Sequence, residues 1–405
     1  MPTNNQTVSR LSRRKRFVFT VVLITASIVI SLWVAEAVIR KVGRYQAAKY
    51  PDYPQAVREK GMGPGGLLKE GFEAQVHDGY GKSVRWKNNA QGFRNDRNFT
   101  KQPAAGVLRI LSLGDSFTAG YRVGQKDTFS RLLQEWSTRT LAPTEVLVSN
   151  IEYPYRAFGY LRKSGYQWSP HIVLLGLTLG NDIAQSYIAR HPTPTGFKHG
   201  LEKLDMPAYC FNHEFSFKRW IRRAFYQVQS TRLYSTIFRP PLAITSWYDR
   251  DGPLKLFDAS NGLGMFIKNS PPQIELAYQR LFHILLKLRR FCDSHGMVFV
   301  VAIFPQRFQV QPQDWQATAT AYNLNPDAFD LMLPNRQILE FCENNRLICL
   351  DPTKEMAAMH RESGQDFYLP RGDMHWNRHG HAAWFEGARP ELEKILQAEI
   401  AETLK

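Results

Sequence analysis

Cysteine is scarce in this chain, which has four in 405 residues: Cys210, Cys292, Cys342 and Cys349. No two of them stand in a Cys-x-x-Cys pattern, so neither a cysteine-ligated zinc site nor a dithiol redox motif is indicated. Cys292, Cys342 and Cys349 lie among apolar residues, where a small buried hydrophobe is the default interpretation. One disulfide is possible in an exported protein, but the spacing does not select a pair.

Acidic residues are almost absent from the first fifty positions, which contain nine Lys and Arg but only Glu36 as an acid. The whole chain has a formal net charge of +16, so half of the excess positive charge lies in this short stretch. The rest is spread thinly, which argues against a nucleic-acid partner. Internal repeats and low-complexity tracts are also absent, and 43% hydrophobic with 22% charged residues is an ordinary globular composition.

Residues 17–35 form a long run without a charge between two basic flanks. About 20 apolar residues match a bilayer core of about 30 Å. We therefore expect a basic flank over residues 1–16 and a transmembrane signal-anchor helix over residues 17–39. The strongly basic amino-terminal side favours the cytoplasm. We therefore expect a single-pass protein of a bacterial inner membrane, with its catalytic domain in the periplasm or otherwise outside the cytoplasm. A cleaved signal peptide with Ala35-Glu36-Ala37 as its cleavage site, or a buried core helix, are the alternatives.

After this span the sequence divides into stretches of different character. Residues 40–106 are polar, Gly-rich and aromatic, as expected of a prelude or linker, whereas residues 107–182 and 273–405 alternate apolar runs with helical periodicity. Residues 183–272 break that rhythm and indicate an insertion or a cap. The alternation predicts an α/β domain with a mainly parallel sheet and helices on both faces. The expected strands are 107–113, 146–148, 171–179, 297–304 and 347–350, and the expected helices are 128–140, 275–295, 335–345 and a last one after Asn377.

Three segments place reactive side chains where expected strands end. Ser116 follows the first strand, with Gly114 permitting a tight turn before it. Asn181 follows the third strand, and Asp373 and His375 precede the last helix. Because functional groups of open parallel sheets gather at the carboxyl ends of strands, we expect these side chains to meet.

Together these residue types suit acyl transfer. A serine hydroxyl becomes a good nucleophile when a base takes its proton, and histidine suits that task. His375 would be the base for Ser116, and Asp373 would hold the other ring nitrogen. Negative charge on the substrate oxygen needs donors, for which Asn181 and the Ser116 N–H are suitable.

The order and context of these segments resemble the SGNH, or GDSL-type, hydrolase superfamily over about residues 107–395, interrupted by the insertion. Gly114-Asp115-Ser116 resembles its first block, Leu179-Gly180-Asn181-Asp182 its Gly-x-Asn-Asp block, and Asp373 and His375, followed by Asn377 and Gly380, its last block. The resemblance implies a flavodoxin-like three-layer α/β/α fold and a serine esterase that works through an acyl-enzyme, without metal or organic cofactor. It assigns Ser116 as nucleophile and Asn181 as oxyanion donor, and leaves Gly114, Asp115, Gly180 and Asp182 as structural residues near the site.

The chain departs from this family's pattern in two places. The family's second block, Asn-x-Gly-x-x-Gly, supplies a backbone N–H to the oxyanion, but the matching stretch Asn150–Tyr155 lacks both glycines. We expect the N–H of Tyr155, or of Arg156, to take that role. The second departure is the short Asp373-x-His375 spacing, which resembles the SGNH-like proteins that O-acetylate exopolysaccharides, although there the Asp-His pair precedes the serine.

Several functions remain open at this stage. The first is an esterase acting on an acylated cell-envelope glycan or lipid, and the second is an O-acetyltransferase that modifies an envelope polysaccharide. A glycan-binding protein that kept the fold without catalysis is the third. A metal site made by Asp373, His375, His379 and His381 is a further alternative, opposed because His379 and His381 flank Gly380 and would point apart.

Overall fold

A computed structural model describes residues 13–49, 68–188 without 79 and 81, 206–212, 217, 221, 262–369 and 373–403. Most of the expected insertion or cap, residues 183–272, therefore lies outside the described residues.

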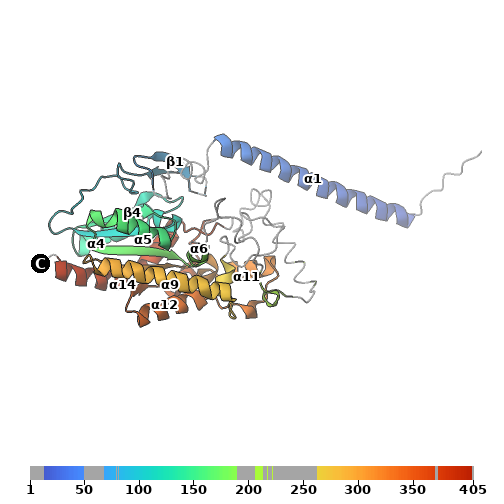
Figure 1. The fold of residues 1–405 in the computed structure, drawn as a ribbon. Helices are drawn as coiled ribbons and strands as arrows, with labels where there is room; N and C mark the ends of the chain where they lie inside the picture. The colour runs from blue at the N-terminus through green and yellow to red at the C-terminus, as the bar shows by residue number, and fades with distance from the viewer. Residues whose placement is uncertain are drawn as a thin grey trace, which may run out of the picture.

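The first described element, helix α1 (Arg13–Lys49), extends away from the rest of the chain (Figure 1). Within its segment Arg14–Val38, the most apolar window of 18 residues has a mean hydropathy of 2.5, and none of that window is buried. Apolar side chains such as Phe17 and Trp33 lie 70% and 73% exposed. By length and composition this helix is able to cross a membrane, a test that a signal sequence also passes.

The centre of the molecule is a five-stranded sheet with the order β4-β3-β5-β6-β7, in which every pair is parallel. This confirms the expected parallel α/β architecture. Continuous apolar runs form the strands because both faces of the sheet are covered. The strands are β3 (Leu108–Gly114), β4 (Thr144–Asn150), β5 (Ile172–Thr178), β6 (Val298–Phe304) and β7 (Ile348–Leu350).

The strand order places a topological switch point between β3 and β5. The chain leaves β3 toward β4 on one side and returns to β5 on the other. Gly114 lies opposite Asn150, and Leu113 lies opposite Leu175, so the three strands end at the same edge. Ligand sites of doubly wound sheets lie at this kind of position.

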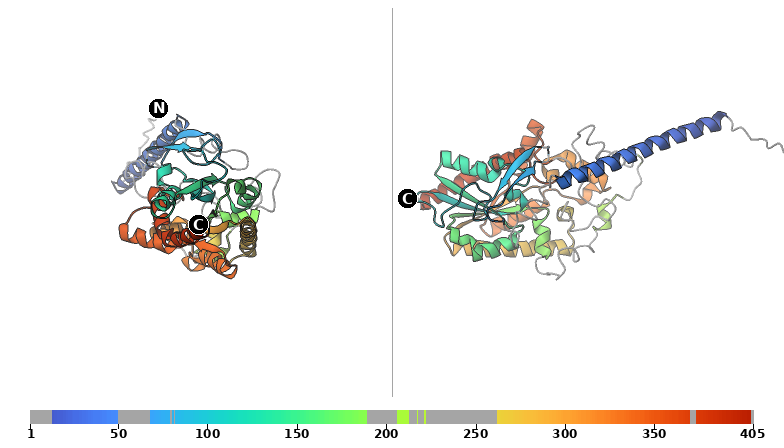
Figure 2. Two further views of the ribbon diagram at one scale, coloured as in Figure 1. Left: turned by 90° about the vertical axis from the view of Figure 1, so that its left-hand side faces the viewer. Right: turned by 90° about the horizontal axis from the view of Figure 1, so that it is seen from above.

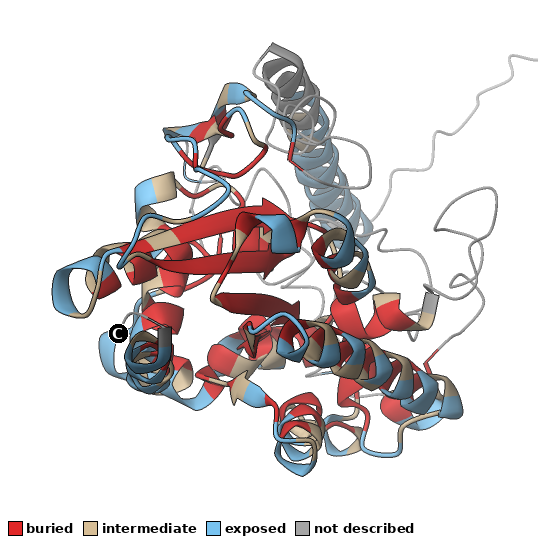
Figure 3. Cartoon of the chain, turned by 60° about the vertical axis from the view of Figure 1, so that its left-hand side comes forward, coloured by how far each residue is buried: buried red, intermediate tan, exposed pale blue. Residues whose placement is uncertain are grey.

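Helices cover both faces of the sheet and complete the expected three layers (Figure 2). Alternate residues of β3 belong to different cores: Leu111 and Leu113 to one, Leu108 and Ile110 to the other. The central strands are buried on both sides (Figure 3). The first core contains residues of α5 (Pro154–Lys163), α9 (Pro272–Asp293) and α12 (Leu333–Asn344), and the second contains residues of α4 (Phe129–Thr140), α13 (Thr353–Ser363) and α14 (Arg378–Thr403).

Shorter elements connect these layers. They are the helices α3 (Ser116–Ala119), α6 (Asp182–Ile188), α10 (Arg307–Val310) and α11 (Pro312–Ala321), and the 3₁₀ turns η2 (Gln125–Asp127), η3 (Gly165–Trp168), η4 (Ala208–Cys210), η5 (Leu263–Phe266) and η6 (Pro326–Ala328).

Part of the stretch expected as a prelude or linker is an ordered hairpin. Strands β1 (Glu73–His77) and β2 (Ser83–Lys87) pair antiparallel. Trp86 on β2 is fully buried in a small apolar cluster that also contains Ala119 and Tyr121, just past Ser116. The hairpin therefore packs directly behind the expected nucleophile.

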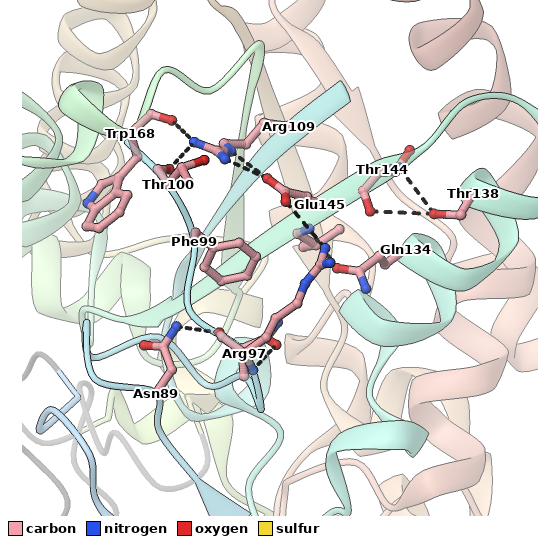
Figure 4. Close-up of polar contacts among 12 residues, drawn as sticks. Asn89, Arg97, Phe99, Thr100, Arg109, Gln134, Thr138, Thr144, Glu145 and Trp168 are labelled. Atoms are coloured by element: carbon pink, nitrogen blue, oxygen red, sulfur yellow. Dashed lines mark hydrogen bonds and ion pairs between the residues drawn. The ribbon is translucent and has the colours of Figure 1, made fainter. Parts of the chain in front are cut away.

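A buried arginine holds the end of this stretch, at Thr100 and Lys101, against the amino edge of the sheet (Figure 4). Arg109 on β3 is fully buried and pairs with Glu145 on β4, with Nη2 2.6 Å from Oε2. Its Nη1 donates to the carbonyl oxygens of Thr100, Lys101 and Trp168 at 2.7 to 2.9 Å. Because every contact is a charge-assisted hydrogen bond, the arginine acts as a rigid fork between three segments.

Two cysteines differ from the default interpretation. Cys342 on α12 and Cys349 on β7 form a disulfide, whereas Cys210 and Cys292 are buried free thiols. The spacing alone did not select this pair because the helix has to fold back onto the edge strand before the two sulfur atoms meet.

Candidate active site

The turn after β3 presents Ser116 at the carboxyl edge of the sheet. Asp115 caps α3, and its Oδ1 accepts a hydrogen bond from Phe117 N at 2.9 Å. A Cβ at Gly114 would overlap Thr118 Oγ1, so the turn requires glycine there. Gly120, at φ 71°, ends this short helix in the left-handed conformation.

Ser116, His375 and Asp373, which the sequence placed at separate strand ends and loops, lie in one hydrogen-bonded line. Ser116 Oγ lies 2.7 Å from His375 Nε2, although 259 positions separate them in the chain. His375 Nδ1 lies 2.6 Å from Asp373 Oδ1, which also accepts from His375 N at 3.0 Å. These distances are short enough for proton transfer from the serine to the imidazole.

The surroundings favour a charged Asp373 and an oriented imidazole. Burial raises the pKa of Asp373, but the charge of His375, its two hydrogen bonds and the charge of Arg122 outweigh burial and hold the pKa below its ordinary value. The His375 ring stacks on Tyr121, with centroids 4.1 Å apart, and lies 5.0 Å from Phe117. Asp373 is therefore set up to stabilise an imidazolium.

The side chain of Asn181 reaches the turn that carries Ser116. Its Nδ2 donates to Asp115 Oδ2 at 3.3 Å, which leaves the second hydrogen of that amide for another acceptor. Asn181 comes from the loop between β5 and α6, so the neighbouring strand supplies it, as the sequence predicted.

The two neighbouring acids are buried and support this loop. Asp182 Oδ2 accepts from Thr178 N at 2.7 Å and so closes the turn around Asn181. Burial raises the pKa of Asp115, and burial together with the charge of Asp115 raises the pKa of Asp182 well above its ordinary range. A Cβ at Gly180 would lie 2.6 Å from Gln306 Nε2, so a larger residue there would require the Gln306 side chain to shift.

The stretch Asn150–Tyr155 contains a residue other than glycine in a backbone conformation that favours glycine. Glu152, at the position of the family's first glycine, has φ 64° in the left-handed region. Ile151 N donates to Gly114 O at 2.7 Å, which joins this turn to the nucleophile turn. Tyr155 lies in the first turn of α5, with a side chain 51% exposed. Arg156 N already donates to Tyr153 O at 3.0 Å. The role of the Tyr155 N–H as a third oxyanion donor stays a prediction.

Two residues hold the site from the hairpin side: Asn377, which the sequence placed in the last block without a role, and Tyr80, which sequence reasoning missed. Asn377 Oδ1 accepts from His379 N and Gly380 N at 2.8 and 3.0 Å, so it caps α14 just past His375. Its Nδ2 donates to Tyr80 Oη at 2.9 Å. An Asn before a helix was the available signal for the cap, but no local pattern pointed to Tyr80.

The histidines of the metal alternative lie in different surroundings. His381 is buried and its Nδ1 accepts from Phe129 N at 3.4 Å. Its pKa is lowered to about 3 by burial, then by Arg94 and His375. Across the described part of the chain, no group of three or more His, Cys, Asp and Glu side chains is arranged to hold a metal ion.

Comparisons with known proteins return similar structures only. No family model matches the chain, and no curated protein matches it. The similar structures include a GDSL-like lipase from Bacteroides thetaiotaomicron, 9% identical over 71% of this chain and 88% of that chain, with a TM-score of 0.31. A psychrotrophic esterase from Pseudoalteromonas sp. is 11% identical over 71% and 98%, with a TM-score of 0.32. A catalytic mutant of an acetylxylan esterase from Geobacillus stearothermophilus is 8% identical over 71% and 95%, with a TM-score of 0.34.

These similar structures are a GDSL-like lipase and two esterases. Likeness at this distance carries no argument about activity, which has to rest on the site itself.

Proposed function

We propose that this protein is a serine esterase that acts through an acyl-enzyme. The line of hydrogen bonds from Ser116 Oγ through His375 to Asp373 Oδ1, at 2.7 and 2.6 Å, is the observation that carries the proposal. A serine that shares a short hydrogen bond with an oriented imidazole is an activated nucleophile.

In the first half-reaction, Ser116 Oγ attacks the ester carbonyl carbon while His375 Nε2 takes the hydroxyl proton. The imidazolium is stabilised by the carboxylate of Asp373, whose lowered pKa keeps it charged. The tetrahedral intermediate then expels the alcohol, which receives the proton from His375, and the acyl group stays on Ser116 as an ester.

In the second half-reaction, His375 removes a proton from water, which attacks the acyl carbonyl. Ser116 leaves with the proton returned by His375, and the carboxylic acid is released. The same geometry would deliver a sugar hydroxyl in place of water, and the product would then be an acylated glycan. Esterase and O-acetyltransferase therefore differ in the acceptor and not in the residues used.

Three donors suit the oxyanion of both intermediates. The Ser116 N–H lies at the start of α3, where it has no partner within the helix. The second hydrogen of Asn181 Nδ2 is available beside it, since the first binds Asp115. We assign the third donor to the N–H of Tyr155. Removal of one such donor typically costs about 100- to 1,000-fold in kcat.

The cell envelope is the proposed place of action, with an acylated glycan or lipid as substrate. Helix α1 would hold the protein at the membrane with its basic amino terminus in the cytoplasm. The Cys342–Cys349 disulfide supports an oxidising compartment such as the periplasm for the α/β domain.

A chromogenic acetyl ester tests this function with the detergent-solubilised full chain. We expect turnover by the wild type, and its loss in Ser116→Ala and in His375→Ala. Ser130→Ala, which changes a buried serine in α4, is the matched control and should retain activity. Activity that survives Ser116→Ala would contradict the assignment.

The acceptor is tested by adding an oligosaccharide to the same assay. Preferential transfer to the sugar would identify an O-acetyltransferase in place of an esterase. Binding of the oligosaccharide without turnover of any ester would instead support the glycan-binding alternative.

A further inference from the structure

Arg307 contacts the backbone on which Asp373, the proposed acid of the site, is carried. It begins α10, three positions after the end of β6 and at the same carboxyl edge as Ser116, and its side chain is only 5% exposed. Its Nη1 donates to the carbonyl oxygens of Leu369 and Asp373 at 3.3 and 3.0 Å. Its Nε donates to Asp314 Oδ2 at 2.9 Å.

The two carbonyl contacts fix the backbone that carries the acid of the site. Asp373 Oδ1 has to reach both the N and the Nδ1 of His375, at 3.0 and 2.6 Å. The Asp373 carbonyl and carboxyl groups hang from the same Cα, so anchoring the carbonyl limits where the carboxyl can lie. Leu369 N donates to His375 O at 2.8 Å, which ties the two residues to each other beside Arg307.

Two further contacts join the segment after β6 to the residues just before Leu369. Tyr368 Oη donates to Pro305 O at 2.9 Å, and Phe367 N donates to Gln311 Oε1 at 2.9 Å. Gln311 Nε2 in turn donates to Asp314 Oδ2 at 2.8 Å. The segment after β6 thus forms a clamp, and Arg307 is its member that reaches Asp373.

We expect the buried Arg307–Asp314 ion pair to contribute little to the stability of the fold. Burial raises the pKa of Asp314 despite the charge and the hydrogen bond of Arg307. Buried ion pairs often contribute less to stability than apolar residues of similar volume. A guanidinium is nevertheless suited to placing two carbonyl groups and a carboxylate in a fixed relation.

We propose that Arg307 is a positioning residue, which holds the Asp373 backbone so that its carboxylate stays in line with His375 Nδ1. The proposal rests on the proposed function, because the alignment matters only if His375 acts as the base. Arg109 offers a matched control, since it is equally buried, pairs with Glu145 and binds three carbonyl oxygens, but at the opposite edge of the sheet.

The test measures the rate at which a fluorophosphonate labels Ser116 in the full chain, as a function of pH, for wild type, Arg307→Lys and Arg109→Lys. Lysine keeps the charge but cannot reproduce the fork. Since misplacement by about 1 Å can cost on the order of 100-fold in rate, we expect Arg307→Lys to label at least about tenfold more slowly per folded molecule. The acid limb of its profile of labelling rate against pH should move to lower pH, because a misaligned Asp373 carboxylate stabilises protonated His375 less.

Among the described residues, the ionisable groups that contact this pair or act on its charge include Asp115, Tyr121, Arg122 and His381, and all four are unchanged in these variants. Arg109→Lys should lower the melting temperature but leave the labelling rate and the acid limb of the folded molecules as in wild type. Identical pH profiles for Arg307→Lys and wild type, or an equal shift in Arg109→Lys, would overturn the proposal.

A second variant covers the case in which Arg307→Lys does not fold. Asp314→Asn leaves the guanidinium in place but weakens its anchor, and we expect a smaller shift of the acid limb in the same direction. No shift in Asp314→Asn would then overturn the proposal. Absence of wild-type labelling at Ser116 has a separate meaning, since it would refute the proposed function itself.

Discussion

The ring of Tyr121 stacks on the imidazole of His375, with centroids 4.1 Å apart and planes inclined by 27°. Tyr121 is 6% exposed and belongs to the apolar cluster formed with the β1–β2 hairpin. An aromatic face attracts a cation, so this contact would favour the imidazolium that the proposed mechanism forms when Ser116 loses its proton. Tyr121 therefore links the β1–β2 hairpin to His375, the proposed base.

Tyr121→Leu should lower kcat by about three- to tenfold, because a buried cation–π contact contributes about 0.7–1.4 kcal/mol. Tyr121→Phe keeps the ring and should stay within about twofold of wild type. Steady-state kinetics normalised by titration of reactive Ser116 measure both. Equal losses in the two variants would assign the effect to the hydroxyl group and contradict the stacking account.

Asn181→Ala should reduce kcat by about 100- to 1,000-fold with little change in KM, because an oxyanion donor acts mainly in the transition state. Asn345→Ala, at the opposite edge of the sheet, is the control and should retain wild-type kcat. A rise in KM without a fall in kcat would show that Asn181 binds the ground state instead.

Glu152→Gly should stabilise the fold by about 0.5–1 kcal/mol, since a left-handed backbone costs most residues about 1–2 kcal/mol and glycine very little. Urea unfolding measures the difference. The change also removes the Glu152–Arg156 ion pair, and Glu152→Gln isolates that contribution. A Glu152→Gly variant less stable than Glu152→Gln would contradict the expected strain.

The buried His381 should lower the free energy of unfolding in acid. Burial, with Arg94 and His375, lowers its pKa to about 3, whereas an unfolded histidine titrates near pH 6.5. The unfolded chain therefore binds one proton more between these values, and the contribution of His381, complete above about pH 6.5, falls by about 1.4 kcal/mol per pH unit down to about pH 3.

His381→Gln should flatten this pH dependence in denaturant titrations at pH 4 to 7. His295→Gln, which changes an exposed histidine, should leave the dependence of the wild type intact. A slope unchanged by His381→Gln would show that His381 is not held neutral in the folded state.

The sheet was predictable because its strands are largely apolar runs, two of which reach a glycine at or just after the end of the strand. The run before Gly114 and the run before Gly180 both became central strands, buried along their whole length. The hairpin β1–β2 was missed because its five-residue strands have no core of their own. Its burial depends on Trp86 contacting Ala119 and Tyr121, which lie far along the chain.

The candidate site was predictable as a set of residue types at strand ends, but its supports were not. Glu152 keeps the left-handed conformation that the missing glycine would have signalled. Arg307 contacts Asp373 across 66 positions, and no local pattern marks a residue that binds a distant carbonyl group. Such contacts follow from the packing of whole segments.

The most direct test of the central claim is to label the intact protein with a fluorophosphonate and map the modified residue. We predict a single modified peptide that contains Ser116, with labelling lost in Ser116→Ala and slowed by at least about 100-fold in His375→Ala. Modification of another serine, or no modification of folded wild-type protein, would contradict an activated nucleophile at this edge of the sheet.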